Sequence, residues 1–165
     1  MNNTNFVSPL SFWAQAVGAA GTEAAVTRAV KAYQRGDYED ALVSFAELAE
    51  NGNGKAQYYL GEMYANGQGS ACDVAVALEW LRKAAHGGFT QAQERLGEIY
   101  RDGALGIVPD GARAYAWLDI AAGTGSSKAA LARDVEASNL SPAELKRGRS
   151  LSTELAAKPL YLLGR

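Results

Sequence analysis

The sequence predicts an all-α protein, a right-handed α-solenoid of stacked helical hairpins with a capping helix at each end. The first observation behind this prediction is a set of small, aromatic and leucine residues that recurs after 36 residues. The second is the spacing of the apolar residues within each copy, which is typical of amphipathic helices. The third is the glycine-rich stretches between them, because glycine is favoured where helices end.

Length and composition indicate one folded domain spanning residues 1–165. Its 165 residues lie close to the ~150 expected of a single domain, and no apolar run approaches the ~18 residues that a membrane span needs. With 16 Lys plus Arg against 18 Asp plus Glu, the chain lacks the basic excess of nucleic-acid binders, so we expect no nucleic-acid partner. One Cys and one His cannot form the usual metal sites, so we expect no metal and no cofactor.

Residues 1–22 are predicted to form an N-terminal capping helix. An apolar stripe at helical spacing is formed by Phe6, Leu10, Trp13 and Val17, and Pro9 is expected to open the helix. This stripe can cover the first repeat helix or join two copies in a dimer. No basic residue precedes Arg28, so no secretory signal is evident. The single Cys72 fits a reducing compartment, and the expected location is the cytoplasm.

Residues 23–139 contain the repeats. Ala56, Gln57, Leu60, Gly61, Tyr64 and Gly67 recur as Ala92, Gln93, Leu96, Gly97, Tyr100 and Gly103. A second set, Ala77, Trp80, Ala84, Ala85 and Gly88, recurs as Ala114, Trp117, Ala121, Ala122 and Gly125. Each unit therefore predicts two helices, the first with a glycine that admits a neighbouring helix and the second with Asp73 or Asp110 as N-cap. Because the aromatic residues recur at fixed places, we expect Tyr64, Tyr100, Trp80 and Trp117 to pack in the core.

The stretch AQYYLGEMYANGQGSACDVAVALEWLRKAAHGG resembles the Sel-1-like repeat, a relative of the tetratricopeptide repeat, and so does AQERLGEIYRDGALGIVPDGARAYAWLDIAAGTG. The resemblance extends over about residues 24 to 139, with a fainter copy around Tyr33 and Gly36. It departs from the family pattern at Val76, Leu81, Leu118 and Ile120. Downstream, Ala129 keeps the register but Arg133 stands where Leu96 predicts an apolar residue, so the repeat gives way to a cap.

Residues 140–165 are predicted to form a C-terminal capping helix and an apolar tail. Ser141 is the expected N-cap, with Pro142 in the first turn and Glu144 three residues after the cap. Leu160 to Leu163 form the tail, which can fold back, occupy a neighbouring copy or be captured by a partner.

The resemblance implies that the first helices of successive units line a concave groove. The predicted partner-binding residues stand between the packing positions and differ from unit to unit: Arg28, Lys31, Arg35, Lys55, Tyr58, Tyr59, Glu62, Asn66, Glu94, Arg95, Glu98 and Arg101. Tyr58 and Tyr59 are typical of interface anchors, although one can belong to the core. The other positions suit a solvated polar face equally well. The basic cluster of Arg28, Lys31 and Arg35, with Lys55 nearby, can grip a peptide carboxylate, but the asparagines of such a clamp are missing.

We predict no catalytic residues, because Cys72 has no evident base and Glu94 and Glu98 are flanked by Arg95 and Arg101. The leading hypothesis is a non-enzymatic interaction scaffold or adaptor that holds a segment of another protein in the groove. A narrower form is an inhibitor or immunity-type protein that masks its partner. The alternatives are a self-assembling structural subunit and a β-lactam or cell-wall hydrolase. The last is suggested only by secreted, cysteine-rich relatives, and a single Cys argues against it.

Overall fold

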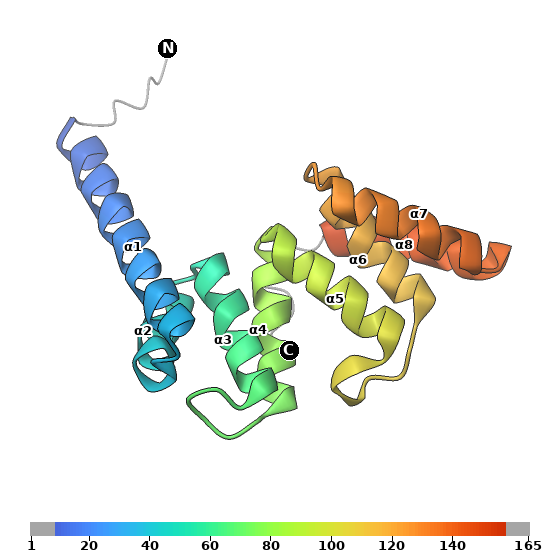
Figure 1. Cartoon of the computed structure of the whole chain (residues 1–165). Helices are drawn as coiled ribbons and strands as arrows, with labels where there is room; N and C mark the ends of the chain where they lie inside the picture. Colours follow the sequence, from blue (N-terminus) through green and yellow to red (C-terminus); the bar gives the residue numbers. More distant parts are fainter. Residues whose placement is uncertain (1–8, 158–165) are drawn as a thin grey trace, which may run out of the picture.

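The computed structural model describes residues 9–157, with side chains from residue 21 onward. Its helices follow one another along an arc, with α1 at one end and α7 and α8 at the other (Figure 1). In chain order they are α1 (Pro9–Arg35), α2 (Tyr38–Glu50), α3 (Gly54–Asn66), α4 (Val74–His86), α5 (Thr90–Asp102), the 3-10 helix η1 (Ala104–Gly106), α6 (Gly111–Gly123), α7 (Ser127–Asn139) and α8 (Pro142–Ala157). The predicted all-α solenoid is confirmed.

The repeat units fold as the pairs α3–α4 and α5–α6, and α2 and α4 each pack on the helix that begins the next unit. Asp73 and Asp110 cap α4 and α6, as predicted, by accepting hydrogen bonds from the backbone N–H groups of Val76 and Arg113. Gly67 and Gly103 end α3 and α5 in the left-handed conformation, which glycine adopts without steric cost.

A recurring glutamine ties each unit to the one before it. Gln57 is buried and donates through Nε2 to the carbonyl of Ala49, 3.1 Å away, near the end of α2. Gln93 repeats the contact with Ala85 in α4 at 3.0 Å. These bonds satisfy carbonyls that a helix C-terminus leaves without a partner of its own, so they fasten the junction between hairpins.

The core consists of three successive clusters of buried side chains along the arc. The first lies among α1, α2 and α3 around Phe45, the second among α4, α5 and α6, and the third around Leu118 between α6 and α7. Tyr100 and Trp117 are buried in the second cluster, and Tyr64 and Trp80 pack against the first. The prediction that the recurring aromatic residues are core residues is confirmed for Tyr100 and Trp117, whereas Tyr64 and Trp80 are only partly buried at the edge of the first cluster.

The N-terminal end differs from the prediction of a separate capping helix over residues 1–22. A single helix, α1, runs without a break from Pro9 to Arg35. No proline stands between Pro9 and Gly36, and the helix continues through two internal glycines, Gly18 and Gly21, of which Gly21 has open space around it. The side chains of the predicted stripe, Phe6, Leu10, Trp13 and Val17, lie outside the described residues, as does the Leu160–Leu163 tail.

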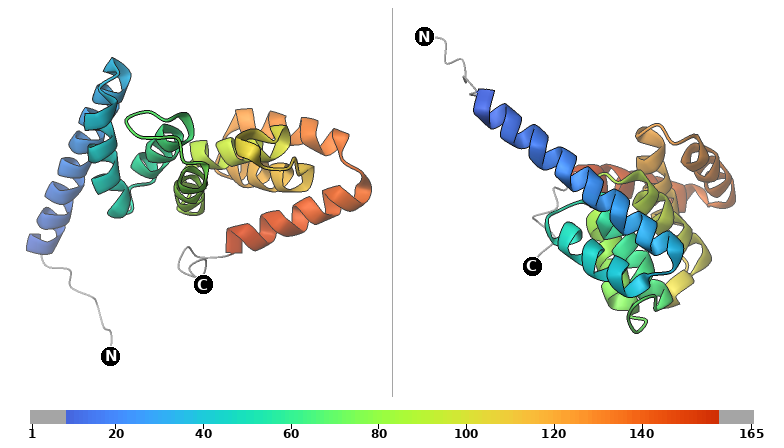
Figure 2. Two further views of the ribbon diagram at one scale, coloured as in Figure 1. Left: turned by 90° about the horizontal axis from the view of Figure 1, so that it is seen from below. Right: turned by 60° about the vertical axis from the view of Figure 1, so that its left-hand side comes forward.

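The C-terminal helix α8 begins with the predicted capping box. Ser141 Oγ accepts from the backbone N–H of Glu144, and the Glu144 carboxylate accepts from the backbone N–H of Ser141 at 2.9 Å. The helix packs along α6 and not along α7 (Figure 2). A Cβ at Gly148 would lie 3.1 Å from the carbonyl oxygen of Ala112, so the two helices cross closely at this glycine.

None of the helices in the described part of the chain is long and apolar enough to cross a membrane.

Candidate functional site

The predicted partner-binding residues lie on the odd-numbered helices α1, α3 and α5, and α7 continues the same row. Side-chain contacts link each of these helices to the next, through Tyr33 and Tyr59, then Glu62 and Arg95, then Glu98 and Lys128. We call the surface that these contacts form the odd-helix face. Its N-terminal half is aromatic and its C-terminal half is charged.

In the aromatic half, Tyr58 and Tyr59 differ in their surroundings. The ring of Tyr59 is stacked on that of Phe45, with 4.9 Å between centroids and 1° between planes, and Phe45 is fully buried. Tyr58 lies one position earlier, at the join between units, where its ring contacts Phe89 at 5.6 Å. Tyr59 thus packs against the first core cluster, and Tyr58 packs against the edge of the second, where it bridges two repeats.

The hydroxyl of Tyr58 is partly shielded from solvent and lies near the carboxylate of Glu62. Burial raises the pKa of Tyr58, and the charge of Glu62 raises it further, while Arg95 opposes both. The phenol therefore stays protonated, and its hydroxyl can donate to an acceptor on a bound chain.

The charged half is a ladder of ion pairs between helices. Arg95 donates through Nε to Glu62 at 2.9 Å and lies 3.8 Å from Glu98. Lys128 of α7 reaches back to Glu98 at 3.0 Å and to Glu94 at 3.4 Å. Burial alone would lower the pKa of Arg95, but the hydrogen bond to Glu62 and the charges of Glu62 and Glu98 together outweigh burial and raise it, so the guanidinium stays charged. The four predicted site residues of this ladder therefore hold neighbouring repeats together and also form the surface: Glu62, Glu94, Arg95 and Glu98.

The remaining predicted residues are placed at the margins. Arg35 is paired with Asp37 at 2.9 Å, and Arg101 with Asp102 at 2.7 Å. Asn66 donates to the carbonyl of Glu62 in its own helix. Arg28 and Lys31 are exposed on α1, and Lys55 is half-buried in the first turn of α3. Because Arg35 is paired with Asp37, not every cation of the basic cluster Arg28, Lys31 and Arg35 is available to bind a carboxylate.

Sequence reasoning did not include Phe89 or Lys128 in the site. Phe89 stands at the N-cap position of α5, where Asn53 and Ser126 provide capping oxygens in the neighbouring units, and it makes no side-chain cap. An aromatic residue at a position that favours Ser, Thr, Asp or Asn is a signal that could have identified it. Lys128 carries no such signal, because only the fold brings it to Glu98.

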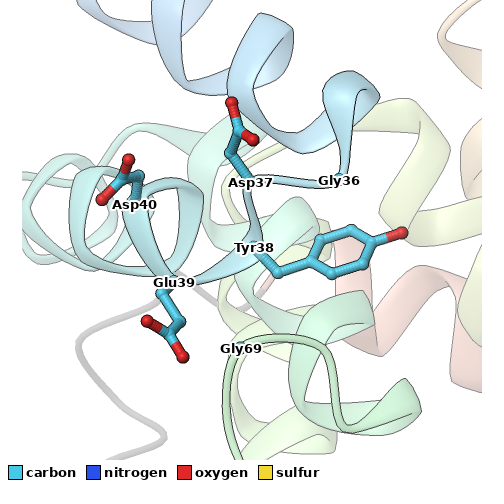
Figure 3. Close-up of a pocket in the computed structure, with 6 residues that line it drawn as sticks. All are labelled: Gly36, Asp37, Tyr38, Glu39, Asp40 and Gly69. Atoms are coloured by element: carbon cyan, nitrogen blue, oxygen red, sulfur yellow. The ribbon is translucent and has the colours of Figure 1, made fainter.

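A cavity of about 400 Å³ lies beside the turn between α1 and α2. It is lined by Gly36, Asp37, Tyr38, Glu39, Asp40 and Gly69. Figure 3 shows the Glu39 side chain pointing away from those of Asp37 and Asp40, so the three carboxylates do not converge on one point. Among the described residues no group of His, Cys, Asp and Glu side chains is arranged to hold a metal ion.

The comparisons with known proteins agree with this architecture. The family model described as Sel1 repeat matches residues 54–89 and 90–123, so the chain contains two Sel1 repeats. The crystal structure of a protective antigen present in uropathogenic Escherichia coli strains, displaying an SLR fold, matches with a TM-score of 0.74 and 28% identity over 88% of this chain and 32% of that chain. A Sel1 repeat protein from Oxalobacter formigenes matches with a TM-score of 0.64 and 29% identity over 86% of this chain and 45% of that one.

The chain thus spans less than half the length of these two solved structures. None of the curated proteins matches it. Sel1-repeat proteins generally act as scaffolds for protein interaction, and they are generally non-catalytic.

Proposed function

We propose that this protein is a non-enzymatic interaction scaffold that binds a segment of a partner protein on the odd-helix face, with Tyr58 as the central anchor. The observation that carries the proposal is the position of Tyr58, which lies partly buried at the join between two repeats, with Phe89 on one side and the Glu62–Arg95 pair on the other. Large rings beside a desolvated Arg are typical of interaction hot spots, which are enriched in Tyr, Trp and Arg.

The surroundings of Tyr58 favour a protein segment as the ligand. The rings of Tyr58 and Phe89 provide an apolar surface, while Glu62 and Arg95 provide an acceptor and a donor side by side. A peptide backbone and its side chains present the same mixture of apolar and hydrogen-bonding groups. The lone Cys72 favours a reducing compartment, so the proposal places the scaffold in the cytoplasm.

The test uses the photo-crosslinking amino acid p-benzoylphenylalanine, placed in the full chain at Tyr58 or, as a control, at exposed Arg149 on α8. After irradiation in cells, mass spectrometry identifies proteins attached to each position. We expect a partner that is crosslinked from Tyr58 and not from Arg149. Its affinity for the wild type is then compared with its affinity for Tyr58→Ala and for the surface control Lys146→Ala, by calorimetry.

We expect Tyr58→Ala to weaken binding by about 2 kcal/mol, roughly thirtyfold, and Lys146→Ala to leave it unchanged. Tyr59 is left in place because truncating a ring stacked on Phe45 would disturb the core. Equal binding by Tyr58→Ala and the wild type, with melting curves that coincide, would exclude Tyr58 as the anchor. If the partner is an enzyme, its activity with the chain added distinguishes an inhibitor from an adaptor.

A further inference from the structure

Two large apolar side chains are exposed one turn apart on α7. Leu131 is 70% and Val135 is 62% exposed. Single exposed apolar residues are ordinary, and exposure alone does not indicate a binding surface. The position of this pair in the repeat indicates what could bind there.

Ala129 in α7 stands 37 residues after Ala92 in α5 and occupies the same repeat position. The same shift of 37 residues places Leu131 and Val135 at the positions of Glu94 and Glu98 in α5. One repeat earlier, the same positions in α3 are Tyr58 and Glu62. In both helices these side chains hold the next odd-numbered helix: Tyr58 contacts Phe89, Glu62 pairs with Arg95, and Glu94 and Glu98 pair with Lys128. Leu131 and Val135 therefore occupy the positions where another helix of the series would dock.

Within the described chain no helix covers these positions, because α8 turns back along α6. Arg147 of α8 donates to Asp110 at 2.8 Å, and Ser152 donates to Asp119 of α6 at 2.7 Å. Gly148 lets the two helices cross closely. Figure 2 shows α8 diverging from α7 after the turn that joins them.

The complementary half of this contact lies at the other end of the arc, on α1 (Figure 1). Tyr33 and Gly36 superimpose on Tyr64 and Gly67, and both glycines end their helix with a positive φ. This register places Ala24 and Arg28 at the positions of Lys128 and Arg95, which in α7 and α5 reach back to the preceding odd-numbered helix. Ala24 and Arg28 are both exposed.

We propose that this protein self-associates head to tail, with Ala24 and Arg28 of α1 in one copy docked on Leu131 and Val135 of α7 in the next. The contact repeats the one between consecutive odd-numbered helices inside the chain, with an apolar pair in place of the carboxylates. Asp134, exposed next to Val135, is paired through Oδ1 with Arg133 of its own helix, whereas the structure shows Arg28 with no ion pair among the described residues. The proposed contact gives Arg28 a carboxylate that it can share with Arg133. Such a heterologous contact produces chains or closed rings of copies.

Sedimentation velocity of the full chain from micromolar to several hundred micromolar tests the proposal. We expect a sedimentation coefficient that rises with concentration for the wild type. The double variant Leu131→Glu, Val135→Glu and, separately, Ala24→Glu, Arg28→Glu are expected to weaken association by about tenfold or more. The matched control is Val43→Glu, Val108→Glu, which changes two valines elsewhere that are at least as exposed and is expected to associate like the wild type.

Mixing the two weakened variants gives the sharper result. Each retains one intact half of the contact, so an equimolar mixture is expected to form a one-to-one pair that neither variant forms alone. A wild type that stays monomeric at all concentrations overturns the proposal. Association that survives the α7 substitutions also overturns it. An α1 variant that still pairs with itself overturns it as well, because this result would indicate a symmetric contact through α7. Circular dichroism melting checks that each variant is folded.

Discussion

At the scale of single residues, the two glycines inside α3 and α5 set how closely the helices of each hairpin approach. A Cβ at Gly61 would lie 2.8 Å from Cγ of Leu81 and 3.1 Å from the carbonyl oxygen of Ala77. Gly97 has the same relation to Leu118 in the next unit, at 2.8 Å. The repeat of 36 residues predicts these positions because only glycine leaves the space that the second helix fills.

We therefore expect Gly61→Ala and Gly97→Ala each to lower the free energy of unfolding by about 1–3 kcal/mol, as is usual when a core is overpacked. The control is Gly21→Ala in α1, where nothing lies within 4 Å of the added Cβ. There the better helix propensity of alanine is expected to raise stability by about 0.5–1 kcal/mol. Urea unfolding followed by circular dichroism measures all three. Equal stability of Gly61→Ala and Gly21→Ala would contradict the close approach.

The ion pairs between side chains of different repeats could not be predicted from the sequence. The exposed pattern predicts that Glu62, Glu94, Arg95 and Glu98 lie on one surface, but helical spacing favours partners within one helix. The structure pairs Arg95 with Glu62 in the preceding unit and Glu98 with Lys128 in the following one. Partners about 30 residues apart are chosen by the packing of the units, which the local pattern does not contain.

At the scale of elements, Asp110 joins two helices. Its carboxylate caps α6 through the backbone N–H of Arg113, and it also accepts two hydrogen bonds from the guanidinium of Arg147 in α8. Burial raises the pKa of Asp110, but the Arg113 backbone and the Arg147 charge outweigh it and hold the pKa below its ordinary value. The charged form of this side chain therefore fastens the C-terminal cap to the last repeat.

Because the folded pKa of Asp110 is depressed, its contribution to stability is complete above the unfolded value of about 3.9 and is lost as the pH falls through the folded pKa. Asp110→Asn keeps the capping oxygen and removes the charge. We expect it to cost about 1 kcal/mol or less at pH 7, since Arg147 is half-exposed, and to cost progressively less below about pH 4. Urea unfolding of both proteins across this range measures the difference. A cost that does not change with pH would mean that the charge is unimportant.

The elements themselves were predictable to different degrees. The caps of α4, α6 and α8 were evident because Asp73, Asp110 and Ser141 each act on a backbone group three residues away. The course of α1 and the partner of α8 were not. Nothing in the local sequence marks whether a helix continues through Gly21, or whether the helix that begins at Pro142 lies on α6 or on α7. Both depend on which apolar surface the neighbouring unit leaves open.

At the scale of the whole molecule, the core is a series of clusters and not one centre. Phe45 belongs to the cluster of α1, α2 and α3, whereas Leu118 belongs to the cluster of α6 and α7 at the other end. In such a solenoid each unit contacts only its neighbours, so stability is close to a sum of local contributions. Damage to one cluster is then expected to be felt mainly at its own end.

Phe45→Ala and Leu118→Ala test this expectation as a pair, because both side chains are almost fully buried and lie in different clusters. Each truncation is expected to cost about 2–5 kcal/mol. Under native conditions, hydrogen exchange read by mass spectrometry is expected to accelerate in α1–α3 for Phe45→Ala and in α6–α8 for Leu118→Ala, with the opposite end of each variant close to the wild type. Uniform acceleration along the chain in both variants would show instead that the inter-unit contacts, including the Glu62–Arg95 pair, couple the repeats into one cooperative unit.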